Sequence, residues 1–287
     1  MNQTMRYPQM IAAAVALATA ATGTAHAQTA TPAIAATPLT FGQTFTLESK
    51  VLGETRRINV YLPPAYTDSA TTRLSVLYMP DGGIGEDFLH VAGLVQVLTG
   101  NGTMRPFILV GIENTQRRRD LTGPTTNAED RKIAPKVGGS AAYRQFIREE
   151  LMPQVKQRYR TTSETAIVGE SLAGLFVVET LLMEPQLFNT YLAFDPSLWW
   201  NNGQLAAQAG ALLRAAGRPS VTVYRATSSQ GDLKATRQLG EAGGSEEART
   251  GKWHYEPMPE ETHATIYHPA ALRAFRAVFK PRARGAR

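Results

Sequence analysis

Short apolar runs alternate with longer amphipathic stretches along most of this 287-residue chain. Runs rich in β-branched and aromatic residues are typical of buried strands: RRINVYLP, RLSVLYMP, FILVGI, TAIVG, TYLAFD, SVTVYRA and WHYEPMP. Apolar residues recur at helical spacing in other stretches, namely 87–98, 141–159, 172–183, 203–216, 232–241 and 269–279. This order predicts an α/β fold with a mostly parallel central sheet and helices on both faces.

The N-terminus has the composition of an export signal. Arg6 precedes an apolar run, Met10–Ala21, and the sequence AHAQ follows it. These features predict a signal peptide over residues 1–27, cut between Ala27 and Gln28. The apolar run is too short to remain as a stable membrane anchor. We therefore expect a periplasmic or secreted protein.

The rest of the chain divides by composition into three parts. Residues 28–39, mostly Ala, Thr and Pro, predict a flexible lead-in to one domain over residues 40–280. Residues 281–287 form a basic tail. The net charge of +6 comes largely from the C-terminal end, because every charged residue from Arg273 onward is basic. A nucleic-acid partner is not expected, since it would require a basic face with interleaved aromatic residues.

The chain contains no cysteine. This excludes disulfides, a thiol nucleophile, thiolate metal ligands and a lipid anchor on a cysteine. There is no HExxH pattern, and no dinucleotide-binding or P-loop pattern follows a strand-like run. We therefore expect neither a metal nor a cofactor, and a metallohydrolase is disfavoured.

The stretch AIVGESLAGLFVVETLL places a serine where a predicted strand becomes a predicted helix. Gly169 lies two residues before Ser171, and Ala173 lies two residues after it. Small flanking residues are what a nucleophile elbow needs, because its sharp turn brings the helix close to the strand. An ordinary turn that happens to contain serine is the alternative. We interpret Ser171 as a nucleophile in an α/β-hydrolase fold.

A serine nucleophile needs a base that accepts its proton, normally a histidine. His263 lies in the polar segment PEETHATIYHP, between the last predicted strand and the last predicted helix. It follows Ser171 in the chain, as the fold requires. The other histidines of the mature chain lie within or at the ends of predicted elements, so we predict His263 as the base.

The acid that orients the histidine is less clearly marked. Asp232 follows the predicted strand SVTVYRA most closely and is our first choice, although it also begins a helical stretch and would make an ordinary N-cap. Asp195, at the end of TYLAFD, and Glu261, two residues before His263, are alternatives. A serine–histidine dyad without an acid is a further possibility.

An oxyanion hole needs two hydrogen-bond donors. The Leu172 amide, directly after the nucleophile at the start of a helix, is the first. The second is expected in the segment MPDGGIGED, where Gly82 and Gly83 allow the backbone to approach a substrate closely.

Four segments together resemble the putative-esterase family of α/β-hydrolases: VLYMPDGG with the following FLHVAGLVQVL, ILVGIENTQRRRDLTGP, AIVGESLAGLF and DPSLWW. The family includes siderophore (enterochelin) esterases, feruloyl esterases and mycolyltransferases. The resemblance covers residues 40–280 and implies Ser171 as nucleophile and His263 as base. Members commonly have a serine at the position of Asp195 and often a glutamate near Ser228.

The resemblance also implies which residues border the substrate. Arg117 and Arg119 precede a long polar connection over residues 122–139, which we interpret as a flap. Their guanidinium groups are candidates for binding an anionic substrate group, although Arg119 with Asp120 is also suited to holding the turn. Trp199 and Trp200 are candidates for an aromatic wall, and adjacent positions predict that one of them is buried.

The combined prediction is a serine carboxylic-ester hydrolase that works through an acyl-enzyme. Its partner is a small-molecule ester, either a siderophore lactone or an aryl or acyl ester. The alternatives are a non-catalytic binding protein with the same fold and an acyltransferase. The sequence does not indicate an oligomeric state.

Overall fold

The computed structural model describes residues 36–217, 220–250 and 252–281. The predicted signal peptide, most of the predicted lead-in and all but one residue of the predicted basic tail lie outside these ranges. The chain divides into a unit Met1–Thr40 and a unit Phe41–Arg287. All the elements described below belong to the second unit.

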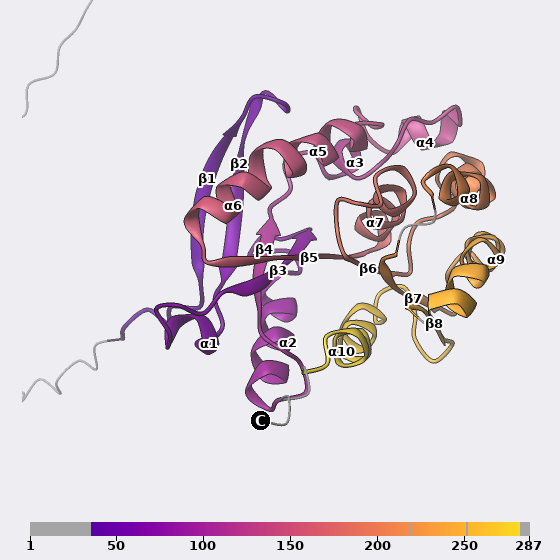
Figure 1. Ribbon diagram of the computed structural model, residues 1–287. Coiled ribbons are helices and arrows are strands. Elements are labelled where there is room, and N and C mark those ends of the chain that lie inside the picture. The colour runs from indigo at the N-terminus through magenta and orange to yellow at the C-terminus, as the bar shows by residue number, and fades with distance from the viewer. Residues whose placement is uncertain (1–35, 218–219, 251, 282–287) are drawn as a thin grey trace, which may run out of the picture. The chain divides into compact units, whose positions relative to one another are not determined.

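Eight strands in the described ranges form one sheet in the order β1-β2-β4-β3-β5-β6-β7-β8 (Figure 1). Strand β2 is antiparallel to β1 and β4, whereas β4, β3 and β5 to β8 pair in parallel. The predicted parallel sheet is therefore confirmed. The strands are β1 Gln43–Ser49, β2 Glu54–Tyr61, β3 Leu74–Pro80, β4 Phe107–Ile112, β5 Thr161–Glu170, β6 Thr190–Phe194, β7 Thr222–Ser228 and β8 Trp253–Met258.

Helices cover both faces of the sheet, with α2 and α10 on one face and α5 to α8 on the other (Figure 1). The longer ones are α2 Phe88–Gly100, α7 Ser171–Met183, α8 Gln204–Ala215, α9 Leu233–Thr250 and α10 Tyr267–Val278. The shorter ones are α1 Pro64–Thr67, α3 Arg117–Asp120, α4 Ala128–Lys132, α5 Ser140–Phe146 and α6 Met152–Arg158, with a π-helical turn η1 Ile147–Leu151 and a 3-10 turn η2 Trp200–Gly203. This layering confirms the predicted α/β-hydrolase architecture.

Some elements differ from the sequence prediction. Strand β1 was not predicted, because its residues are mostly exposed and it pairs only with β2 at the edge of the sheet. The predicted helix 141–159 is α5, η1 and α6 in succession. The connection over residues 122–139 contains α4, whose N-cap Asn127 accepts a hydrogen bond from the Glu129 amide at 2.9 Å. This connection therefore contains a short capped helix and is not wholly irregular.

The strands separate two apolar clusters by the alternation of their side chains. In β3, Val76 and Tyr78 pack on the α7 face, whereas Leu77 and Met79 pack on the face covered by α2 and α10. Because both faces of the sheet are covered, β3 is buried along its whole length. This explains why its sequence is almost continuously apolar.

One arginine is fully buried on the α7 face. Arg56 in β2 has no exposed surface, and its guanidinium donates to Asp120 Oδ2 at 2.6 Å and to Glu54 Oε1 at 2.8 Å. It also lies over the ring of Tyr143, with 5.2 Å between its Cζ atom and the ring centroid. These contacts join β2 to α3 and α5, and α3 carries two of the candidate substrate residues.

We expect Arg56→Met to lower the free energy of unfolding by about 1.5–3 kcal/mol, because it removes one of the two arginine partners of the buried Asp120 carboxylate. The matched control is Arg57→Met, since Arg57 is half exposed and pairs with Glu113 at 3.6 Å. This surface pair should contribute no more than about 1 kcal/mol. Urea denaturation of both variants provides the measurement. Equal losses in the two variants would contradict the structural role assigned to Arg56.

Candidate active site

Ser171 lies at the junction of β5 and α7 and has a backbone φ of +59°. A non-glycine residue in this left-handed region is strained, and such strain is a feature of a nucleophile elbow. Gly169 makes the turn possible, since a Cβ atom there would lie 2.8 Å from the Cβ atom of Ala173. The alanine in place of the second elbow glycine is therefore accommodated.

The structure brings Ser171 and His263 together, although 92 residues separate them. The Ser171 hydroxyl lies 3.0 Å from His263 Nε2. On the other side of the ring, His263 Nδ1 lies 2.6 Å from Asp195 Oδ2. Because a carboxylate only accepts, Nδ1 carries the proton and Nε2 is free to accept the serine proton. This is the geometry of a Ser-His-Asp triad.

Asp195 is held firmly in this orientation. Its side chain is 1% exposed, and it accepts hydrogen bonds from the Ser228 amide at 3.0 Å and the Ser228 hydroxyl at 2.8 Å. Its own amide donates to Ala226 O in β7 at 2.8 Å, and its backbone φ is +41°. The carboxylate thus accepts three hydrogen bonds, two from Ser228 and one from His263, and the backbone amide makes a fourth, so the carboxylate has little freedom to leave His263.

The structure does not support Asp232 as the acid. Asp232 Oδ1 accepts a hydrogen bond from the Ala235 amide at 2.9 Å, which is the N-cap arrangement for α9. The alternative Glu261 also points elsewhere, since its carboxylate accepts from the Thr265 hydroxyl at 2.6 Å. The position next to His263 belongs to Asp195, the second of the three candidates. A dyad without an acid does not match this geometry.

The predicted oxyanion donors differ in their availability. The Leu172 amide is among the first amides of α7, so it has no acceptor one helical turn earlier and lies at the positive end of the helix dipole. The Gly82 amide is engaged, because it donates to Ile112 O at 3.0 Å. The Gly83 amide donates to Glu86 Oε2 at 2.7 Å and reaches a substrate only if Glu86 turns away. The Gly82 amide is therefore not free to donate to an oxyanion in this structure.

Gly82 has a different role, which its surroundings explain. A Cβ atom at this position would lie 2.2 Å from the Ile112 amide nitrogen and 2.3 Å from Gly111 Cα. The residue must therefore be glycine for the segment after β3 to cross the end of β4. The sequence predicts a close approach of the Gly82 backbone to a substrate, whereas the structure shows a close approach to strand β4.

The two predicted substrate arginines are both paired with carboxylates. Arg117 donates to both oxygens of Asp81, at 2.7 and 2.8 Å, and its side chain is 37% exposed. Arg119 donates to Glu54 and Asp120 and is largely buried. Arg119 therefore holds α3 against β2, and Arg117 is the member of the pair with surface available to a ligand.

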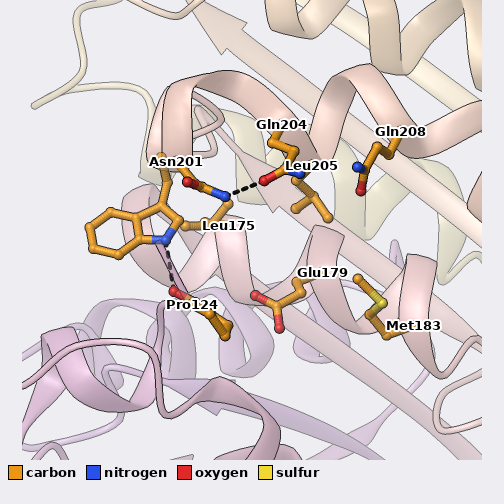
Figure 2. A pocket seen from close by; sticks show the side chains of 10 residues that line it. Pro124, Leu175, Glu179, Met183, Asn201, Gln204, Leu205 and Gln208 are labelled. Atoms are coloured by element: carbon orange, nitrogen blue, oxygen red, sulfur yellow. Dashed lines mark hydrogen bonds between the residues drawn. The ribbon is translucent and has the colours of Figure 1, made fainter. Parts of the chain in front are cut away.

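The tryptophan pair divides as adjacent positions predict. Trp199 is 47% exposed, whereas Trp200 is buried and its indole N–H donates to Gly123 O at 2.9 Å. Trp200 lines a cavity of about 160 Å³ between α7, α8 and the start of the 122–139 connection (Figure 2). Its other lining residues are Gly123, Pro124, Leu175, Glu179, Met183, Asn201, Gln204, Leu205 and Gln208. The described lining includes neither Ser171 nor His263, so Trp200 is not placed at the triad.

Sequence reasoning missed two residues that contact the triad. Ser228, at the end of β7, donates to Asp195, and only the sheet pairing of β6 with β7 reveals this contact. Glu170, within the elbow itself, places Oε1 at 3.3 Å from His263 Nε2. Its position next to Ser171 indicates that Glu170 lies near the site, but the sequence does not show which way its side chain points.

The site lies at the carboxyl edge of the parallel strands. The strand order reverses at β3, between β4 and β5, and Asp81 and Ser171 follow the two strands β3 and β5 at this point. In open α/β sheets such a reversal leaves a crevice at the carboxyl ends, where ligands bind.

The chain is similar to proteins that are named as esterases. The family model "Putative esterase" matches residues 49–264. A ferri-bacillibactin esterase of Bacillus subtilis is 30% identical over 165 residues, which cover 52% of this chain and 56% of that protein. A siderophore triacetylfusarinine C esterase of Aspergillus fumigatus is 31% identical over 178 residues, covering 58% and 59%. The chain thus aligns with little more than half the length of these relatives.

Solved structures extend the similarity across most of the chain. The crystal structure of an IroE-like serine hydrolase from Shewanella oneidensis has a TM-score of 0.71 and 28% identity, and covers 83% of this chain and 80% of that one. The family match spans well over half of the sequence and includes Ser171, Asp195 and His263. The chain belongs to the putative-esterase family of α/β-hydrolases.

Proposed function

We propose that this protein is a serine carboxylic-ester hydrolase that forms an acyl-enzyme on Ser171. One observation carries the proposal: a single imidazole, His263, contacts the Ser171 hydroxyl through Nε2 and the buried Asp195 carboxylate through Nδ1. Family membership and the similarity to proteins named as esterases support it. A non-catalytic binding protein would not need this arrangement or the strained backbone at Ser171.

The geometry supports the following proton path. Ser171 Oγ attacks the ester carbonyl while its proton moves to His263 Nε2, and Asp195 stabilises the resulting imidazolium through Nδ1–H. The Leu172 amide donates to the oxyanion. The imidazolium then gives its proton to the leaving alcohol, which leaves an acyl group on Ser171. Water repeats the sequence, and the acid product and the free serine are formed.

We further propose a siderophore ester as the substrate class. The two relatives from Bacillus subtilis and Aspergillus fumigatus are siderophore esterases by their names. Beside α3 this chain has a cationic cavity of about 430 Å³, whose lining includes neither Ser171 nor His263 but whose charge suits a substrate rich in acidic oxygens. The cavity is lined by Gln116, Arg117, Arg118, Arg119, Ala134, Pro135 and Lys136. Arg118 donates to the Ile133 carbonyl oxygen at 3.0 Å, and this neutral partner does not compensate its charge.

We also propose that the protein is exported, as its N-terminal sequence predicts. Within the part of the chain that the structure describes, no helix has the length and apolar character needed to cross a membrane. Support for the signal peptide comes from the sequence of residues 1–27, which lie outside the described ranges.

The choice of acid is tested by a matched pair of substitutions. Asp195→Asn should lower turnover by at least about a hundredfold, because an amide at this position no longer stabilises the imidazolium. Asp232→Asn should keep turnover within about twofold and also keep stability, since asparagine caps a helix as well as aspartate does. Steady-state kinetics on a chromogenic short-chain ester, with thermal melting as a check on folding, provides the measurement. A larger loss in Asp232→Asn would reverse the assignment.

Substrate class is tested by a hydrolysis screen with Ser171→Ala as the blank. Siderophore lactones, feruloyl esters and simple acyl esters are compared by kcat/KM. We expect siderophore esters to exceed the other two classes by at least about tenfold, which corresponds to about 1.4 kcal/mol of transition-state binding. A preference for feruloyl esters would refute the substrate class but leave the esterase proposal intact. Activity that persists in Ser171→Ala would refute both.

The signal peptide predicts a mature N-terminus at Gln28 in the exported protein. The intact mass of protein recovered from the periplasm or medium after expression in a Gram-negative host should match residues 28–287. Recovery of exported protein that still contains residues 1–27 would contradict the cleavage site.

A further inference from the structure

The Glu170 carboxyl and the Ser171 hydroxyl both lie close to the same atom, Nε2 of His263. Its Oε1 lies 3.3 Å from His263 Nε2, and the Ser171 hydroxyl lies 3.0 Å from the same nitrogen. The Glu170 side chain is 15% exposed, and Oε1 is buried without a hydrogen-bond partner in the described part of the chain. The proposed proton path does not use this group.

The protonation states of Glu170 and His263 decide whether the contact between them is favourable. With its proton on Nδ1, a neutral His263 presents a lone pair at Nε2. An ionised Glu170 would repel that lone pair, so the contact is unfavourable unless one more proton is bound, either on Nε2 or on Glu170. If the proton is on Nε2, the imidazolium cannot accept the Ser171 proton. If it is on Glu170, His263 stays neutral and able to act as the base.

The surroundings favour the proton on Glu170. Charged and titratable groups act on its carboxyl from six other segments, namely Asp81 after β3, Asp87 before α2, Arg117 in α3, Asp195 after β6, His263 after β8 and Tyr267 in α10. Burial, together with the nearby carboxylates, raises the pKa of the Glu170 carboxyl to about 8. The Arg117 guanidinium lowers this pKa only in part, and both oxygens of Asp81 already occupy that guanidinium.

We propose that Glu170 is a positioning residue of the esterase site that works as a neutral carboxylic acid, leaving His263 Nε2 unprotonated for the Ser171 proton in the resting enzyme and losing this role when it ionises. The proposal rests on the proposed esterase function. In its ionised form the carboxylate would hold the proton on Nε2 and oppose its transfer to the leaving alcohol. It would also place a negative charge beside the nucleophile, where the oxyanion forms.

The pH profile of kcat/KM on a chromogenic short-chain ester tests this role, with Ser171→Ala subtracted as the blank. In the wild type kcat/KM should fall to about a tenth of its maximum by pH 9, one unit above a pKa of about 8. Glu170→Gln keeps the size of the side chain but does not ionise. Relative to its own maximum, this variant should lose less than about twofold at pH 9.

Asp87→Asn is the matched control, because Asp87 is another carboxyl near the site and its charge helps to raise the pKa of Glu170. Removing that charge should keep the alkaline fall in kcat/KM but move it to lower pH. An alkaline fall of equal size in Glu170→Gln would overturn the proposal.

Thermal melting provides a readout that does not need activity. A carboxyl whose pKa is raised on folding contributes its stability below its unfolded pKa, and this contribution is lost as the pH rises through the folded pKa. The melting temperature of Glu170→Gln relative to the wild type should therefore increase from pH 4.5 to pH 8 and then level off. A difference that does not change with pH would overturn the role of Glu170. An inactive wild type with the expected melting pattern would instead overturn the esterase function alone.

Discussion

The arrangement of the site depends on the buried carboxylate of Asp195. Donors from two different segments converge on it: the amide and hydroxyl of Ser228 at the end of β7, and Nδ1 of His263 in the loop after β8. These contacts set the histidine tautomer and hold the loop over the sheet edge. Because the His263 side chain is itself 46% exposed, this anchor, rather than burial, keeps Nε2 directed at Ser171.

In a parallel sheet, the carboxylate that orients the histidine can follow either of two neighbouring strands. Neighbouring strands lie about 4.8 Å apart, and their carboxyl ends meet at one edge. A carboxylate after β6 and one after β7 can therefore reach the same imidazole. In this chain Asp195 follows β6, and Ser228 occupies the end of β7. The hydroxyl of Ser228 then supports the acid that stands beside it.

Strain and crowded charge are concentrated at the same edge. Asp81, Ser171 and Asp195 each have a left-handed backbone, which costs of the order of 1–3 kcal/mol per residue. Asp81 and Asp195 also contribute to the electrostatic field that raises the pKa of Glu170. Contacts away from the triad, such as the buried Arg56–Asp120 pair between β2 and α3, stabilise the layers that hold these residues in place.

Periodicity, small-residue spacing and chain order in the sequence predict seven of the eight described strands, the elbow at Ser171 and His263 as the base. The sequence could not determine the acid: Asp232, Asp195 and Glu261 were all compatible with the pattern, and strand pairing and side-chain direction distinguish them. The same holds for Gly82, whose amide is used by β4, and for Glu170, whose carboxyl turns toward His263. Contacts between segments far apart in the chain decided these points, because local sequence does not specify which strand ends become neighbours.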